Sequence, residues 1–317
     1  MTSTVQTNNG SIAGGIANGL LAAAIVGLFL TIGKIVFQEV SVIFFSFCVM
    51  AGTNFFYLLY LLAKGKKASI IKAGKSYPEL YLVGLFAATL TLMENWGLKL
   101  SLPTNAGILM RADLFFSLLI GYFLWRERLR PLEWVGMATM LMGISQVLQL
   151  SLTNFHFGSA GDVMLLGSAL LLAVNAEIIK HRLHGVEDII VAYFNSGICA
   201  LAYFALAISH NELWPLPQAS GLTWALILAC TLIQVTHYLT YYRSLHDLPA
   251  WLARVLCLAT SVAAVLSSAW WLQEKVTLHQ IWGMLLVTTG IILLCWLQKR
   301  RSGGDNMNAV AVPGKFL

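Results

Sequence analysis

The stretch FLWRERLRPLEWVGMATMLMGI, residues 123–144, returns 147 residues later as WWLQEKVTLHQIWGMLLVTTGI, residues 270–291. The two copies share, in register, a glutamate, a Gly-Met pair and a Gly-Ile pair: Glu127 with Glu274, Gly136 and Met137 with Gly283 and Met284, and Gly143 and Ile144 with Gly290 and Ile291. An internal repeat indicates the architecture of a chain before any local pattern does. The sequence therefore consists of two copies of one unit.

The repeat extends upstream, because GLKLSLPTNAGIL at residues 97–109 aligns with SLHDLPAWLARVL at residues 244–256 at the same offset. Each copy holds five apolar stretches, and an odd number of membrane crossings turns the second copy upside down in the bilayer. Inverted repeats of this kind are typical of secondary transporters. The short polar segment at residues 151–160 is the boundary between the copies.

Apolar residues dominate the composition: 58% of the 317 residues are hydrophobic and only 11% are charged, against about 25% charged in soluble domains. Ten stretches are long enough to cross about 30 Å of hydrocarbon, namely 12–33, 40–63, 80–100, 105–125, 132–150, 161–179, 189–208, 221–241, 249–272 and 279–297. The sequence predicts an all-α polytopic membrane protein with ten transmembrane helices in two inverted five-helix repeats. The repeats are expected at residues 1–150 and 151–300, followed by a disordered cytoplasmic tail at residues 301–317.

Lysine and arginine residues indicate the orientation, since positive residues gather in cytoplasmic loops. With the N-terminus inside, fifteen of them fall on the cytoplasmic side and three, Lys34, Lys99 and Lys275, fall outside. Both termini are therefore expected in the cytoplasm. The net charge of +6 follows from this loop bias, so no nucleic-acid partner is predicted.

Two five-span halves, each ending in an apolar helix, a turn with a glutamate and a glycine-bearing last helix, resemble the EamA-type repeats of the drug/metabolite transporter superfamily. The resemblance covers nearly the whole chain and is strongest over residues 97–148 and 244–295. It implies a central cavity lined mainly by the first, third, fourth, sixth, eighth and ninth spans, with the fifth and tenth at the periphery. It also implies the export of amino acids or related metabolites.

Ionisable residues inside the predicted spans are few, and a charge at the bilayer centre costs about 2.5 to 3.5 kcal/mol. Glu94, beside Asn95, lies in the third span, and Arg111 and Asp113 lie in the fourth. At 1.5 Å per residue, Glu94 and Arg111 are each roughly 13 Å from the turn between these spans. We expect them either to form a buried ion pair or to contact the substrate.

Arg111 and Asp113 are separated by about 200° around a helix of 3.6 residues per turn. One of them is therefore expected to face the cavity and the other a neighbouring helix. Arg254 lies a few residues into the ninth span and is expected to reach back towards the cytoplasm. Glu177 is expected to form a surface pair with the basic residues three and four positions later.

The second copy adds Asn175 in the sixth span, and Gln234 and His237 on one face of the eighth. His237 is interpreted either as a hydrogen-bonded link between helices or as a proton-coupling group. A cavity that presents both a carboxylate and a guanidinium would suit a zwitterion such as an amino acid.

The first span carries Gly15, Gly19, Ala23 and Gly27 at successive spacings of four. Small residues on one face allow another helix to approach closely in a membrane. This helix is therefore expected to be central rather than to face lipid.

Motifs of soluble enzymes are absent from the sequence. The segment KAGKS, residues 72–76, lacks the glycine that a phosphate loop would need at Ser69, and it is predicted to be a basic loop. The five cysteines lie in apolar runs without metal-ligand spacing and are interpreted as packed thiols. We expect no enzymatic activity, no cofactor and no metal.

The sequence favours a secondary active transporter, an exporter, of small polar metabolites such as amino acids, working by alternating access across a bacterial inner membrane. Its expected partners are a small-molecule substrate, protons if His237 couples transport, and the lipid bilayer, with the chain as a monomer or a homodimer. The alternative is a non-transporting receptor or an intramembrane enzyme on the same fold.

Overall fold

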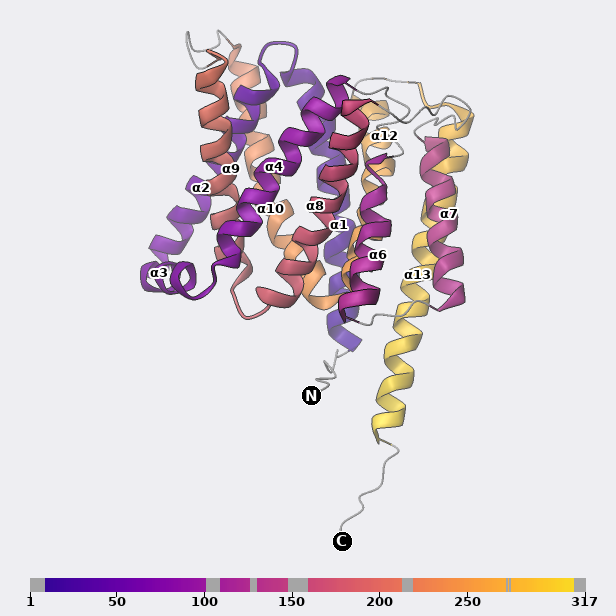
Figure 1. The fold of residues 1–317 in the computed structure, drawn as a ribbon. Coiled ribbons are helices and arrows are strands. Elements are labelled where there is room, and N and C mark those ends of the chain that lie inside the picture. The colour runs from indigo at the N-terminus through magenta and orange to yellow at the C-terminus, as the bar shows by residue number, and fades with distance from the viewer. Residues whose placement is uncertain are drawn as a thin grey trace.

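A computed structural model describes residues 9–100, 109–125, 130–147, 159–212, 219–271, 273 and 275–310. The helices of this part of the chain are α1 (Asn9–Val36), α2 (Val42–Ala63), α3 (Lys67–Ser76), α4 (Glu79–Leu100), α6 (Ala112–Trp125), α7 (Pro131–Val147), α8 (Ala160–Arg182), α9 (Asp188–Ser209), α10 (Gly221–Asp247), α11 (Ala250–Leu256), α12 (Ala259–Trp271) and α13 (Leu278–Val310). Most of them stand side by side as one bundle (Figure 1). The described residues therefore confirm the prediction of an all-α protein.

Seven of the described segments are long and apolar enough to cross a membrane, counting α11 and α12 as one, and α6 is a shorter apolar helix. A chain that crosses a bilayer forms helices because all its backbone N–H and C=O groups must be hydrogen-bonded within the protein. Serine side chains cap several of these helices, because the first N–H groups lack partners within the helix. Ser41, Ser159 and Ser220 accept hydrogen bonds at the starts of α2, α8 and α10.

Three elements differ from the sequence prediction. The segment predicted as a basic loop forms the helix α3, with Gly74 packed near Tyr81 and Phe194. The ninth span is divided into α11 and α12 by a turn at Cys257 and Leu258. α13 continues to Val310, into the segment predicted as a disordered tail.

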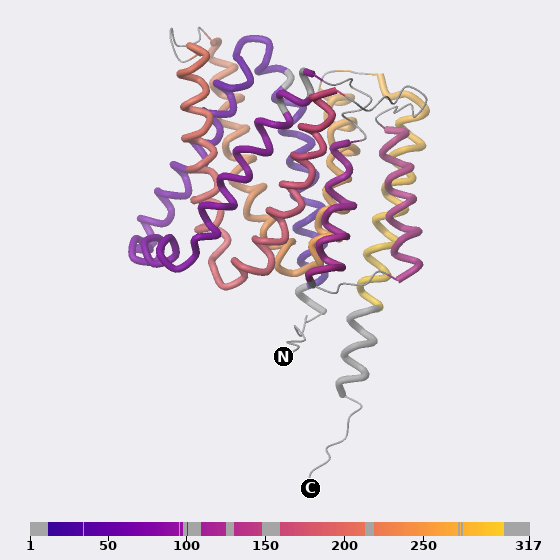
Figure 2. The backbone as a smooth tube through the Cα atoms, viewed as in Figure 1, coloured from indigo at the N-terminus to yellow at the C-terminus, as the bar shows by residue number. Residues whose placement is uncertain are grey.

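The helices of the two halves begin at matching positions of the repeat. α6 and α12 begin at Ala112 and Ala259, and α7 and α13 begin at Pro131 and Leu278, in both cases 147 residues apart. α7 and α13 run antiparallel at one edge of the bundle (Figures 1 and 2). This agrees with the peripheral position that the family resemblance implies for the last span of each half.

The contact between α7 and α13 is formed by the repeated glycines. A Cβ atom added at Gly143 would lie 2.7 Å from the carbonyl oxygen of Gly283, and one added at Gly283 would lie 2.6 Å from that of Gly143. At the other end of the contact, a Cβ atom at Gly290 would lie 3.0 Å from the carbonyl oxygen of Gly136. The two backbones therefore touch, and the contact is reciprocal at Gly143 and Gly283.

α1 lies inside the bundle, as its small residues predict. A Cβ atom at Gly19 would lie 2.8 Å from Ser244 of α10, and one at Gly27 would lie 2.7 Å from the backbone nitrogen of Ala264 in α12. These glycines let α1 cross two helices of the second half. The prediction that this helix is central is confirmed.

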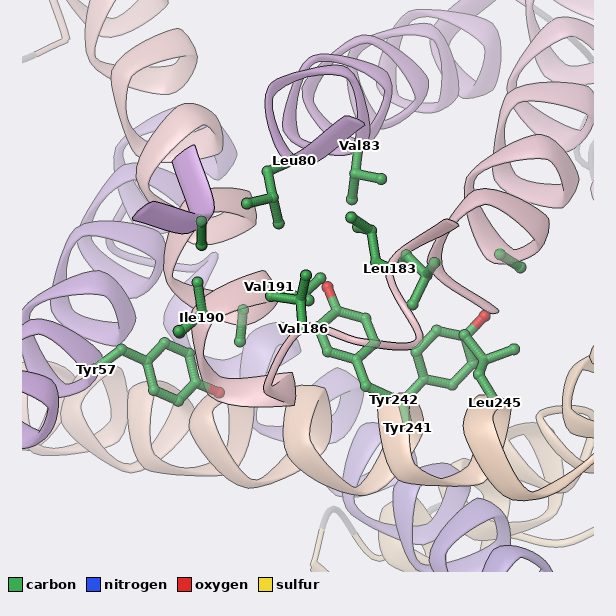
Figure 3. Packing of buried hydrophobic residues seen from close by; sticks show 14 of the residues in the cluster. Tyr57, Leu80, Val83, Leu183, Val186, Ile190, Val191, Tyr241, Tyr242 and Leu245 are labelled. Carbon is green, nitrogen blue, oxygen red and sulfur yellow. The ribbon is translucent and has the colours of Figure 1, made fainter. Parts of the chain in front are cut away.

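Apolar side chains fill the end of the bundle at which α1 begins. The helices α2, α4, α9 and α10 and the turn after α8 contribute the cluster shown in Figure 3, which includes Tyr57, Leu80, Leu183, Ile190 and Tyr242. All five of these side chains are almost fully buried. We name this set the lower cluster, and it closes the bundle on the side of the chain's N-terminal helix start.

Candidate functional site

A cavity of about 470 Å³ lies in the middle of the bundle. It is lined by residues of α1, α2, α4, α8, α9, α10, α11 and by Thr260 of α12, together with Arg111 in the turn before α6. The family resemblance implied walls from the first, third, fourth, sixth, eighth and ninth spans. Of the described residues of the fourth span, Arg111 lines the cavity and α6 does not, and the structure adds walls from α2 and α9. Its volume lies within the range of about 300 to 1,000 Å³ that is typical of small-molecule sites. We name it the central cavity.

The central cavity collects most of the side chains singled out in the sequence: Glu94, Arg111, Asn175, Gln234 and His237 all line it. The side chain of Asn95 lies outside the described residues. Asp113 is buried behind the wall, with 3% of its surface exposed. Residues from both halves of the chain therefore meet in one place.

Arg254 is the charged lining residue whose position the sequence did not predict. Its Nε donates a hydrogen bond to Asp113 Oδ2 at 3.0 Å, its Nη2 contacts the same oxygen, and its Nη1 donates to the hydroxyl of Tyr241 at 3.3 Å. The side chains of Arg254 and Asp113 are 11% and 4% exposed. The expectation that Arg254 reaches the cytoplasm is wrong, because α11 turns this residue towards α6 and the interior.

Glu94 and Arg111 line the same cavity, but no ion pair joins them among the described side chains. Arg111 Nη2 donates to Ser261 Oγ at 3.4 Å, and its buried Nε has no hydrogen-bond partner in the described part of the chain. The distance of roughly 13 Å from the turn between the spans assumes that Arg111 is helical, whereas Arg111 lies in a turn before α6 begins. A direct Glu94–Arg111 pair is therefore not formed in this structure.

The other prediction for the fourth span agrees with the geometry. Arg111 faces the cavity, and Asp113 faces the neighbouring helix α11. With Asp113 neutralising Arg254, the cavity presents two further charges of opposite sign, the carboxylate of Glu94 and the guanidinium of Arg111.

Aromatic residues of α10 form one wall of the cavity. The His237 ring stacks with those of Tyr238 and Tyr241, at centroid distances of 5.8 Å in both cases, and the rings of Tyr238 and Tyr242 stack at 5.6 Å. Tyr242 accepts a hydrogen bond of 2.7 Å from Asn195 of α9. This wall was not predicted from the sequence, although the segment HYLTYY at residues 237–242 places aromatic rings one helical turn apart.

Besides Arg111 Nε, two further polar atoms at the cavity wall have no hydrogen-bond partner among the described residues, Asn175 Oδ1 and His237 Nδ1. Buried polar atoms are nearly always satisfied in folded proteins. These two atoms are therefore candidates for contact with a bound polar molecule.

Glu177 lies further along α8, towards its C-terminal end. Its Oε2 is 3.2 Å from His181 Nε2, one turn later, and its side chain is 5% exposed. The predicted pairing with a following basic residue is thus formed. The expectation of a surface position is wrong, because α8 turns this face into the bundle.

The side chains of the central cavity are suited to binding a small molecule. No group of three or more His, Cys, Asp or Glu side chains with the arrangement of a metal site occurs among the described residues. What the cavity offers is one carboxylate, one guanidinium outside an ion pair, several neutral polar groups and an aromatic wall. Such a set can hold a small polar molecule that carries both charges.

Comparison with known proteins gives two matches to the model of the EamA-like transporter family, over residues 13–149 and 159–296. Among curated proteins, the chain is similar to a protein of Salmonella typhimurium named "Probable amino-acid metabolite efflux pump", with 23% identity over 69% of this chain and 81% of that protein. A protein of Escherichia coli with the same name is 22% identical over the same shares. A solved structure titled "Crystal structure of protein" has a TM-score of 0.70 at 18% identity and covers 90% of this chain and 98% of that one.

Proposed function

Because this chain belongs to the EamA-like transporter family, we propose that it is a secondary active transporter that exports small polar metabolites, amino acids among them. Transport proceeds by alternating access of two inverted five-helix repeats around the central cavity. The membrane is the bacterial inner membrane, and both termini lie in the cytoplasm. The names of the two enterobacterial relatives support this substrate class and this direction.

The central observation is the pair of separated charges in the central cavity. Glu94 and Arg111 line the same space and are not joined to each other. An amino-acid zwitterion carries an ammonium group for the carboxylate of Glu94 and a carboxylate group for the guanidinium of Arg111. Charge-assisted hydrogen bonds are about twice as strong as neutral ones, so these two contacts orient the molecule.

Neutral groups complete the site. Asn175, Gln234 and His237 contribute polar atoms from α8 and α10, and the ring of Tyr238 contributes apolar surface for the substrate side chain. The free ring nitrogen of His237 is the place for a coupling proton, since imidazole changes charge near physiological pH.

Counterflow into proteoliposomes loaded with single metabolites tests the function directly. We expect accumulation of labelled amino acids against a chemical gradient driven by the unlabelled pool. Ligand binding to the purified protein without counterflow of any metabolite would instead support the receptor alternative, and chemical conversion of a metabolite would support an intramembrane enzyme.

Substitution of the two cavity charges tests the site. Glu94→Gln and Arg111→Gln should each abolish counterflow of zwitterionic amino acids, because each removes one half of the charge recognition. Glu79→Gln, at the start of α4 and outside the cavity, is the matched control and should keep counterflow. Melting of all three variants near the parent temperature would exclude unfolding as the cause. Full activity of both cavity variants would reject the assignment.

Reporter fusions test the orientation. A reporter that is active only outside the cytoplasm should be silent after Lys299 and active in the loop at residues 211–220. The reverse pattern would reject the proposed topology and the inversion of the second repeat.

A further inference from the structure

A second cavity, of about 660 Å³, adjoins the central one. The two share Phe37, Arg111 and Thr260 in their walls. The second cavity is otherwise bounded by the last turns of α1 and α7, by α12 and by the start of α13. Figure 1 shows these helix ends at the side of the bundle opposite the start of α1. We name it the upper cavity.

The charges of the two cavities differ. Among the described residues, the central cavity contains Glu94 together with Arg111 and Arg254, whereas the only charged residues that line the upper cavity are Arg111 and Lys275. The polar remainder of the upper cavity consists of hydroxyl and amide groups, such as Ser261, Ser268 and Gln280. Its described lining is therefore positively charged without a carboxylate.

Arg111 lies at the boundary with its guanidinium only weakly held. Its one hydrogen bond in the described part of the chain is that to Ser261, a residue of the upper cavity, at 3.4 Å, and its Nε is unpaired there. Arg254, by contrast, is fixed by Asp113 and Tyr241. Arg111 is therefore the cation with donors left for a ligand.

The wall between α1 and α12 keeps the hydroxyl groups of the upper cavity in place. Gly27 allows the two backbones to touch, and Thr31 Oγ1 lies 2.6 Å from Ser267 Oγ and 3.4 Å from Ser268 Oγ. The hydroxyl groups of α12 therefore line the upper cavity between Arg111 and the start of α13.

From this arrangement we propose that the upper cavity is an anion-selective vestibule, which passes carboxylate-bearing molecules between Lys275 and Arg111. The inference rests on the proposed function for the identity of the molecules that pass. The upper cavity would be a second binding site, for a carboxylate group alone. It would also be the route by which the molecule leaves the bundle on the side opposite the lower cluster. Clefts of one charge sign raise the local concentration of the opposite ion by about 10- to 1,000-fold.

The test uses a reporter thiol and needs no substrate. Val265, which lines the upper cavity and not the central one, is replaced by cysteine in the full chain. The purified variant is treated with two methanethiosulfonates of similar size, one ending in a sulfonate and one in a trimethylammonium group. Each reagent forms a disulfide with the reporter thiolate and releases methanesulfinate, and labelling is followed by intact-protein mass spectrometry. The rates of the parent, with its five native cysteines, are subtracted.

We expect the sulfonate reagent to label Val265→Cys at least about 10-fold faster than the ammonium reagent, after correction by the ratio for a free thiol in solution. Adding Lys275→Gln should lower the ratio, and adding Arg111→Gln as well should bring it close to 1. Ser209→Cys, exposed at the end of α9, is the matched control and should show no such dependence.

Two outcomes would overturn the inference. A Val265→Cys thiol that resists both reagents in a folded protein would show that the upper cavity is closed to water. Equal or faster labelling by the ammonium reagent would show that it does not select anions. Because neither measurement involves transport, failure of the vestibule and failure of the proposed transporter function remain separate results.

Discussion

The α7–α13 contact and the α6–α11 contact both join the first half of the chain to the second, but by different means. In the first, the same residue types face each other from both sides, Gly143 against Gly283 and Gly136 against Gly290. In the second, Asp113 binds Arg254, and neither has a counterpart: the repeat places Thr260 opposite Asp113 and Gly107 opposite Arg254. The glycine contact thus joins equivalent residue types, whereas each half contributes one charge to the ion pair at a position where the other half has no charge.

The two contacts require different residues from the two halves of the chain. At Gly143 and Gly283 a side chain on either helix would meet the backbone of the other helix, so a substitution in either half disturbs the contact. A buried ion pair needs complementary residues, which two identical copies cannot supply at equivalent positions. Arg254 lines the central cavity, where the two halves meet, and Asp113 lies behind the cavity wall.

The largest effect on stability is expected from breaking the asymmetric contact. Asp113→Asn leaves the guanidinium of Arg254 buried without its partner, and the loss of one member of a buried pair costs about 3 to 5 kcal/mol. The melting temperature of the detergent-solubilised protein should fall strongly, and Arg254→Gln should give a similar loss. The Asp113→Asn, Arg254→Gln double variant should recover much of it, as a double-mutant cycle would measure. Additive losses would show that the two side chains act independently.

A smaller effect is expected at the symmetric contact. Gly143→Leu and Gly283→Leu force side chains against backbone atoms that lie 2.6 to 2.7 Å from the added Cβ positions, and overpacking typically costs about 1 to 3 kcal/mol. Because the contact is reciprocal, the two substitutions should lower the melting temperature by similar amounts. Clearly different drops in melting temperature for the two variants would show that the contact is not reciprocal. Gly65→Ala, at a glycine with open space but a φ of +67°, separates backbone strain from crowding.

The smallest effect is expected where the halves are joined at an exposed surface. Lys66, before α3, binds Glu187, before α9, and their side chains are 33% and 51% exposed. Exposed ion pairs contribute about 0 to 1 kcal/mol. Lys66→Ala should therefore change the melting temperature little, and less at high salt. If Lys66→Ala lowered the melting temperature as much as Asp113→Asn does, the position of an ion pair between the halves would matter more than the burial of its charges.

The sequence indicated the glycines of the symmetric contact, though not the contact between their helices, and it indicated neither the partners nor the pairing of the asymmetric contact. Glycines seven positions apart mark a helix face in either copy, so the repeat alone indicated Gly136, Gly143 and their counterparts. Asp113 and Arg254 are 141 positions apart and do not match in the repeat, so nothing local connects them. The turn at Cys257, which follows Arg254 and separates α11 from α12, contains no proline or glycine from which it could be predicted.

The residues of the central cavity were predictable as residue types but not as contacts. A charge or an amide in an apolar span is visible in any single helix, which is how Glu94, Arg111, Asn175, Gln234 and His237 were found. Whether two of them touch depends on where helices break and rotate. Of the two alternatives expected for Glu94 and Arg111, the direct ion pair is not formed, because α6 begins at Ala112 and Arg111 precedes it.

The pair between Asp113 and Arg254 also sets a schedule for the growing chain. Its two members are separated by 141 residues, and a ribosome adding about 5 to 20 residues per second needs roughly 7 to 28 s to reach the second from the first. During that interval Asp113 has been synthesised and Arg254, its partner in the folded protein, has not. The first half is thus synthesised in a state that only the second half can complete, and a pause in translation between them lengthens the time for which the unfinished chain is open to degradation.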